Sequence, residues 1–158
     1  MGMVIGSTRR NTSASFRGLS SSSSRASKLA FASSKKCGTR CERMLAEALL
    51  KEEIHVSSHA SNVPGKPDFI VASVRLAIFV DGDFWHGRNL QSRLRRLRTG
   101  ANPAYWTAKI LSNVRRDRRL RARLRRQGWS VMRVWETDVF RDTRRAVRRI
   151  SRQLAKLQ

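Results

Sequence analysis

The chain contains 158 residues, 40% of them hydrophobic, so it has the length of one domain and enough apolar material for one core. Its 34 Lys and Arg against 11 Asp and Glu give a net charge of +23, which favours a polyanionic partner, by default a nucleic acid. No run approaches the roughly eighteen apolar residues of a membrane helix, so the composition excludes an integral membrane protein.

The two cysteines, Cys37 and Cys41, are too few for a disulfide framework or a four-ligand zinc site. They indicate reduced thiols, and we expect a cytoplasmic protein of bacterial type, associated with the nucleoid. The oligomeric state is open, with a monomer favoured.

The N-terminal segment differs in composition from the rest. Residues 1–41 contain no Asp or Glu, but eight Lys or Arg and eleven Ser. Such a sequence buries too little apolar surface to offset the entropy of ordering, so we expect residues 1–38 to be a disordered basic arm and residues 39–158 to be one folded domain. An organellar targeting segment has the same composition and is the alternative.

A helix is expected from Thr39, because Thr39 and Glu42 have the spacing of a capping box ahead of an apolar stripe. Glu42 is thus a helix cap, a carboxylate that faces a functional cleft, or both. Residues 54–58 alternate like a short edge strand. His55 and His59 lack the spacing of metal ligands, so we interpret them as surface residues.

Two apolar runs, residues 68–73 and 76–80, predict adjacent core strands. Asp68 opens the first and Asp81 closes the second, next to residues that should be buried. Turn formation is the ordinary role of such aspartates, and an oxygen-rich Mg²⁺ site is the alternative.

Phe84 and Trp85 follow outside any strand, ahead of a basic loop over residues 88–98. Large aromatic residues in such a position either pack on the core or insert between DNA bases. Lys66, in the loop before the first strand, either contacts a phosphate or is solvated.

Asn102 and Pro103 open the longest helix, which ends at Gln127. Asp117 lies in the middle of its apolar stripe. A buried carboxylate needs a partner, so Asp117 either pairs with an arginine or serves a functional site.

Residues 129–135 predict a third core strand, and residues 142–157 predict a last helix with arginines facing outward. This order of elements predicts an α/β fold, a three-layer sandwich with a central mixed β-sheet flanked by helices.

Four segments, PGKPDF, FVDGDFWHG, NVRRD and GWSVMRVWE, occur in this order within residues 39–136. In them the chain resembles the very short patch repair (Vsr) endonuclease family. The resemblance implies a restriction-endonuclease-like fold and a Mg²⁺-dependent enzyme that nicks double-stranded DNA beside a T:G mismatch. It further implies that Asp68 and the backbone carbonyl of Val80 bind the metal, and that His86 is a general base oriented by Asp117.

The same resemblance implies that the aromatic pair intercalates beside the mismatch and that the following arginines contact phosphates. The candidate catalytic residues are Asp68, His86, Asp117, Asp81 and Glu42, and the candidate DNA contacts are Lys66, Phe84, Trp85, Arg88, Arg93, Arg95 and Arg96.

The chain departs from the family in two places. The family's structural zinc is bound around the FWH segment and after the last strand, where this chain has Asp83, Arg88, Leu90 and Thr137, so we expect no structural zinc. Asp81 stands where well-known members have a histidine, which leaves mismatch preference open.

Two other functions compete with a mismatch endonuclease. One is a restriction-type nuclease without mismatch preference, and the other is a non-catalytic basic DNA-binding protein that has kept the fold. A binding protein does not need Asp68, His86 and Asp117 together, so the sequence favours an enzyme.

Overall fold

The structure is a computed structural model that describes residues 38–58 and 60–158. The basic arm expected over residues 1–38, except Gly38, and the histidine at position 59 therefore lie outside the described residues. No helix in the described part of the chain combines the length and the apolar character needed to cross a bilayer.

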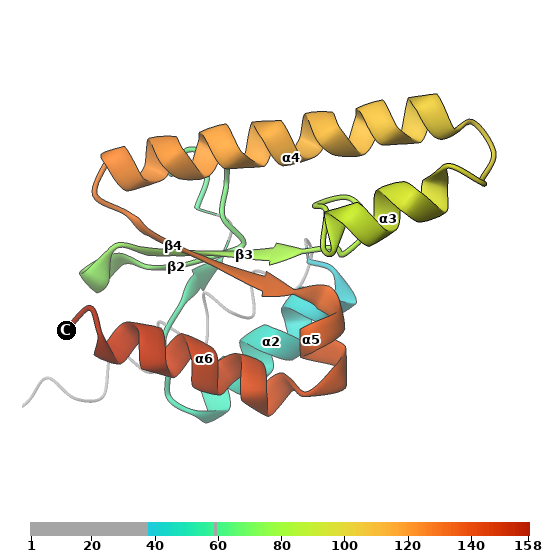
Figure 1. Ribbon diagram of the computed structural model, residues 1–158. Helices are drawn as coiled ribbons and strands as arrows, with labels where there is room; N and C mark the ends of the chain where they lie inside the picture. The colour runs from blue at the N-terminus through green and yellow to red at the C-terminus, as the bar shows by residue number, and fades with distance from the viewer. Residues whose placement is uncertain (1–37, 59) are drawn as a thin grey trace, which may run out of the picture.

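One mixed sheet of four strands, in the order β1-β2-β3-β4, forms the middle layer (Figure 1). The antiparallel strands are β1 (Ser57–Ser58), β2 (Phe69–Val71) and β3 (Leu76–Asp81), and β4 (Ser130–Trp135) runs parallel to β3. The two expected core strands, the third strand and the short edge strand are confirmed. Because β3 and β4 are parallel, their carboxyl ends meet at one edge of the sheet.

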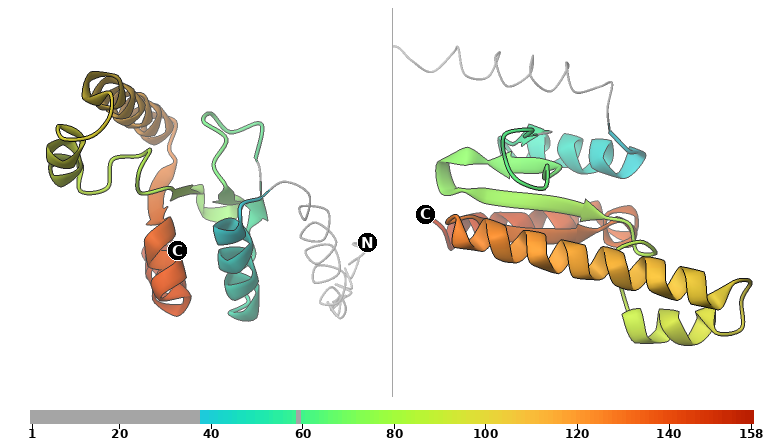
Figure 2. Two further views of the ribbon diagram at one scale, coloured as in Figure 1. Left: turned by 90° about the vertical axis from the view of Figure 1, so that its right-hand side faces the viewer. Right: turned by 90° about the horizontal axis from the view of Figure 1, so that it is seen from above.

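Helices cover both faces of this sheet, as Figures 1 and 2 show. The long helix α4 and the short helix α3 lie on one side, and α2, α5 and α6 lie on the other, which confirms the three-layer sandwich. The helices are α2 (Arg40–Lys51), the 3-10 turn η2 (Ala72–Val74), α3 (Leu90–Leu97), α4 (Pro103–Arg126), α5 (Glu136–Arg141) and α6 (Thr143–Ala155).

The alternation of the strands divides the core into two parts. Leu76 and Ile78 are fully buried against α2, α5 and α6. Ile70 and Phe79 pack on the opposite side with Leu124 of α4. Successive side chains of a strand point to opposite faces, so a central sheet in which both faces carry apolar residues must be covered on both sides.

The structure confirms one expected helix cap and corrects another. The Thr39 hydroxyl accepts a hydrogen bond from the Glu42 backbone (3.2 Å) and donates one to its carboxylate (2.9 Å), so α2 is capped as predicted. Asn102 precedes α4 as expected, but it has a left-handed conformation (φ 54°) and its side chain does not cap the helix.

The expectation of a loop over residues 88–98 is wrong, because most of this segment is α3. Leu90, Leu94 and Leu97 recur every three or four residues and lie half-buried along the helix. The high density of arginine obscured this period in the sequence. The helix α5 was also not expected from the sequence.

Candidate active site

The segment that follows β3, residues 82–89, contains His86 and both candidate aromatic residues, and we refer to it as the site loop. Gly87 allows this loop to approach α4 closely, since its φ is 71° and a Cβ there would lie 2.6 Å from Val114. Only glycine satisfies both conditions without strain. The Trp85 carbonyl accepts a hydrogen bond from the Asn113 side chain (3.4 Å), so α4 binds consecutive residues of the loop.

His86 lies between two carboxylates. Its Nδ1 is 2.6 Å from Oδ2 of Asp117 and 3.3 Å from Oδ1 of Asp81. Asp117 is buried in the middle of α4, as its place in the apolar stripe predicts, and Asp81 is buried at the end of β3. The structure therefore brings together three of the residues selected from the sequence. With Nδ1 occupied, Nε2 is the ring nitrogen left to exchange a proton.

Arg133, which sequence reasoning missed, organises this group from β4. Its Nε donates a hydrogen bond to Asp81, and its Nη2 donates one to the backbone carbonyl of His86 (3.3 Å). The guanidinium also lies 4.3 Å from the centre of the Trp135 ring. Arg133 neutralises Asp81 and leaves Asp117 as the closer partner of the imidazole. We call Asp81, His86, Asp117 and Arg133 the histidine cluster.

Asp68 and Val80, the two candidate metal ligands, are adjacent across the β2–β3 hairpin. The Val80 backbone N–H donates a hydrogen bond of 2.7 Å to Oδ2 of Asp68. Asp68 immediately precedes β2 and Val80 is near the end of β3, so the antiparallel pairing brings them together.

The buried thiol of Cys41, at the start of α2, lies among negatively charged side chains. Its pKa is raised to about 12, first by burial and then by the carboxylates of Glu136, Glu42, Asp68 and Asp83. These four carboxylates disfavour the ionised form of the thiol. Glu136 was missed in the sequence. Its position directly after an expected strand was the available signal.

The donor set near Asp68 fits a hard divalent cation. Carboxylate and carbonyl oxygens suit Mg²⁺, which takes few protein ligands and leaves its other positions to water and phosphate. In the ranges 38–58 and 60–158, no three His, Cys, Asp or Glu side chains converge to enclose a metal.

A second group of charges holds the other side of the site loop, and we call it the Asp83–Arg88 cluster: Asp83, Arg88, Thr137 and Asp138. Asp83 accepts hydrogen bonds from Arg88 (3.0 Å) and from the Thr137 backbone (3.1 Å). Arg88 also donates to Asp138 (2.6 Å). Asp83, Arg88, Leu90 and Thr137 stand where the family has its zinc ligands. Three of these residues, Asp83, Arg88 and Thr137, bind one another instead.

The pKa values of this cluster follow from its hydrogen bonds. Burial raises the pKa of Asp83, but hydrogen bonds from Thr137 and Arg88 outweigh it, so the pKa lies below its ordinary value. The hydrogen bond with Asp138 is the main cause that raises the pKa of Arg88. Arg88, a candidate phosphate contact, thus has its guanidinium engaged by two carboxylates.

Four aromatic side chains form a cluster beside His86. The ring centre of Phe84 lies 4.9 Å from that of Trp85 and 6.0 Å from that of Trp106, and Tyr105 lies 5.1 Å from Trp106. Trp85 and Tyr105 are 45% and 52% exposed. We call these residues the aromatic cluster. Trp106 lies on α4, so the long helix contributes to this cluster.

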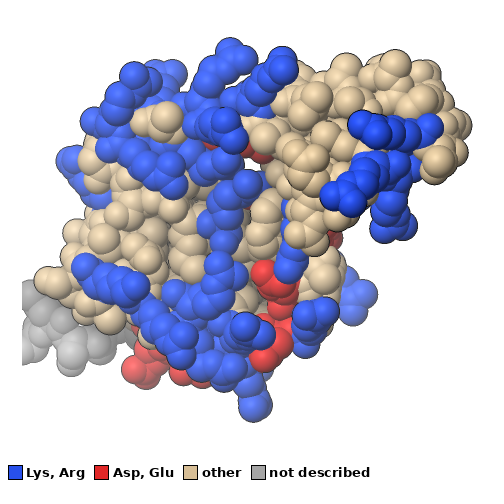
Figure 3. Space-filling model, viewed as in Figure 1, with Lys and Arg blue, Asp and Glu red and all other residues tan. Residues whose placement is uncertain are grey.

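The remaining candidate DNA contacts lie on the surface. Lys66 is exposed in the loop before β2, and Arg95 and Arg96 are exposed on α3. Arg93 is half-buried, with its guanidinium 5.0 Å from the centre of the Phe84 ring. Lys and Arg side chains also cover much of α4 and α6 in Figure 3, so the cationic surface extends well beyond the site loop.

A mixed sheet whose parallel strands end at a group of carboxylates, a histidine held by aspartates and a cationic surface define a nuclease with a restriction-endonuclease-like fold. Residues 21–92 match the family model of the DNA mismatch endonuclease Vsr. The chain belongs to the Vsr family, and it is a DNA endonuclease. Members of this family generally use a divalent metal ion.

Individual relatives agree with this assignment. The chain is 38% identical over 111 residues to the type II nicking enzyme V.NmeDIP of Neisseria meningitidis serogroup C, covering 70% of this chain and 74% of the relative. It is 33% identical to the type II nicking enzyme V.HpaIIP of Haemophilus parainfluenzae, over 70% and 77%. It is 37% identical to the DNA mismatch endonuclease Vsr of Escherichia coli K12, over 62% and 61%.

Proposed function

We propose that this endonuclease nicks one strand of duplex DNA beside a T:G mismatch and that it uses Mg²⁺. The observation that carries the proposal is the 2.6 Å contact between His86 and Asp117, at the same edge of the sheet as Asp68 and Val80. The names of the relatives support nicking and mismatch recognition, since two are nicking enzymes and one is a mismatch endonuclease.

The histidine cluster supplies the proton transfer that phosphodiester hydrolysis needs. Asp117 holds the Nδ1–H of His86, so Nε2 accepts a proton from water as the water oxygen bonds to phosphorus and the bond to the leaving oxygen breaks. A Mg²⁺ bound by the Asp68 carboxylate and the Val80 carbonyl would supply positive charge to the phosphate oxygens. Arg133 holds Asp81 in an ion pair, and Asp117 is the closer carboxylate partner of His86.

The aromatic cluster supports recognition of a distorted base pair. Exposed aromatic residues beside a nuclease site can insert between base steps, and unstacking costs least where pairing is already weak. Trp106 packs against Phe84 and Trp85, with ring centres 6.0 and 5.9 Å away. This contact holds the pair from α4.

The test is nicking of two duplexes that differ only in one T:G or T:A pair, with and without Mg²⁺. We expect Mg²⁺-dependent nicking of one strand, faster on the T:G duplex. Equal rates on both duplexes would leave a nuclease without mismatch preference. No cleavage of either duplex in Mg²⁺ would overturn the proposed mechanism.

A further inference from the structure

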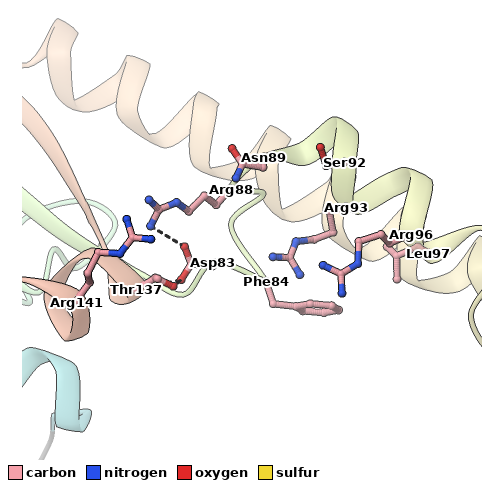
Figure 4. Close-up of a pocket in the computed structure, with 10 residues that line it drawn as sticks. All are labelled: Asp83, Phe84, Arg88, Asn89, Ser92, Arg93, Arg96, Leu97, Thr137 and Arg141. Atoms are coloured by element: carbon pink, nitrogen blue, oxygen red, sulfur yellow. Dashed lines mark hydrogen bonds and ion pairs between the residues drawn. The ribbon is translucent and has the colours of Figure 1, made fainter.

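Between the site loop, α3 and α5 lies a cavity of about 530 Å³ (Figure 4). Four arginines line it, Arg88, Arg93, Arg96 and Arg141, against the single carboxylate of Asp83. That carboxylate already accepts hydrogen bonds from Arg88 and Thr137. The cavity therefore carries an excess of positive charge, and a concave surface of one sign concentrates the opposite charge.

Three of these arginines have no internal counter-ion. Within the described residues, Arg93, Arg96 and Arg141 form no ion pair, whereas Arg88 is bound by Asp83 and Asp138. In Figure 4 the side chains of Arg93 and Arg96 extend from α3 toward Phe84, and that of Arg141 extends from α5 toward Asp83. The fold thus directs cations from two helices into one space.

Arg93 has an unsatisfied polar atom at the wall of this cavity. Its Nε is buried and has no hydrogen-bond partner in the part of the chain that the structure describes. A buried polar group without a partner is costly, and a charged group costs most. A bound anion with several acceptor oxygens would accept hydrogen bonds from the guanidinium groups that line the cavity and reduce the repulsion among the arginines.

We propose that this cavity binds one phosphate of the DNA backbone, next to the point where the aromatic cluster meets the duplex. The inference rests on the proposed function, which makes DNA the substrate and the aromatic cluster a DNA contact. Guanidinium groups match phosphate oxygens with paired hydrogen bonds, which favours phosphate as the anion. Because Arg93 also covers the ring of Phe84, a phosphate bound there fixes the backbone and the aromatic cluster together.

This assignment separates the arginines by role. Arg93, Arg96 and Arg141 bind the phosphate, while Arg88 holds the wall of the cavity through the Asp83–Arg88 cluster. Arg141 lies in α5, about fifty residues beyond α3, and composition does not distinguish it from the other arginines. Arg95 lies on α3 outside the cavity, so it contributes only to the general positive field.

The experiment measures binding of a set of T:G duplexes in which one phosphate at a time is replaced by a neutral methylphosphonate, without metal. We expect one position near the mismatch at which the replacement weakens wild-type binding about tenfold, the loss of one charge-assisted contact. Arg96→Gln should weaken binding of the unmodified duplex by a similar factor and be insensitive to replacement at that position.

The matched control is Arg95→Gln, which removes the same charge from the same helix. It should bind all duplexes less tightly and keep the wild-type sensitivity at the one position. Arg141→Gln tests the site from a different helix and should behave like Arg96→Gln, with thermal melting to confirm that each variant is folded. If both Arg96→Gln and Arg141→Gln keep the wild-type pattern, the assignment is wrong.

Two further measurements separate a site for a DNA phosphate from a site for a free anion and from the catalytic function. Inorganic phosphate should bind wild type only weakly, and tight binding of it with no sensitive DNA position would overturn the assignment in favour of a free anion. Nicking without any sensitive position would overturn the phosphate site alone. A sensitive position without nicking would instead overturn the proposed catalytic function alone.

Discussion

The two charged clusters on either side of the site loop contain similar groups but have different properties. In the Asp83–Arg88 cluster both carboxylates are bound by an arginine, and Arg149 adds a second contact to Asp138 (3.7 Å). In the histidine cluster Arg133 binds Asp81, and the exposed Arg116 lies 3.7 Å from Asp117. Here, however, both carboxylates also contact the imidazole of His86. A guanidinium does not release its proton at neutral pH, whereas an imidazole does.

The two clusters therefore have different roles: one supports the site loop, and the other can take part in the reaction. The Asp83–Arg88 cluster connects the site loop to α5 through carboxylates and a guanidinium. The histidine cluster connects the same loop to α4 and β4 and contains an imidazole, which can both accept and donate a proton. Four sets of variants test this division.

The largest effect is expected for the groups assigned to the reaction. Asp68→Asn and His86→Ala should each lower the nicking rate by about 10³-fold, because they remove a metal ligand and the proton acceptor. DNA affinity without metal should be unchanged or slightly higher for Asp68→Asn, since binding depends on many cations. Single-turnover nicking and a binding assay measure both quantities. Nicking by Asp68→Asn at the wild-type rate would disprove the assignment.

Asp117→Asn should have the next largest effect, about 10²-fold on the rate. The amide has the shape of the carboxylate but no charge to stabilise the protonated imidazole of His86. The pH dependence of single-turnover nicking should change with the rate, while the melting temperature stays near that of wild type. If both the pH profile and the nicking rate of Asp117→Asn equal those of wild type, Asp117 does not act through His86.

Arg88→Gln should affect stability more than chemistry and lower the free energy of unfolding by about 2 kcal/mol. Arg123→Gln, which removes an exposed charge from α4, is the control and should change stability little. Chemical denaturation measures both. A normal stability for Arg88→Gln would show that the Asp83–Arg88 cluster does not support the loop.

The same variant has a characteristic pH dependence. The pKa of Asp83 is lowered in the folded state, so its contribution is present above its ordinary pKa, about 4, and is lost as the pH falls through the folded-state value. Wild type should therefore lose stability below about pH 4, and Arg88→Gln should lose less over that range. Equal acid sensitivity of the two proteins would contradict this cause.

The smallest effect is expected for the aromatic cluster, which belongs to neither charged cluster. Phe84→Ala and Trp85→Ala should reduce the ratio of T:G to T:A nicking by about tenfold, because one stacking contact with a base is worth about 1–3 kcal/mol. The rate on matched DNA should change less than that ratio. An unchanged ratio in both variants would show that the preference, if present, comes from another surface.

Local sequence patterns determined much of the fold. The hairpin strands, the capped start of α2, the long α4 and the strand β4 all follow from periodicity and end signals, which depend on neighbouring residues. The charged segment of α3 shows where this reasoning fails, because its leucine period is present but is masked by arginine. The placement of Asp117 in an apolar stripe also indicated in advance that it needs a partner.

Only the tertiary structure decided which charges meet. Arg133 binds Asp81, Thr137 binds Asp83, and each partner lies more than fifty positions away in the sequence. In a chain with 34 cationic residues, composition cannot select the one that reaches a given carboxylate. That choice depends on the parallel pairing of β3 with β4, which brings their carboxyl ends to the same edge of the sheet. The energy of these contacts arises from burial and distance, which exist only after distant segments have packed.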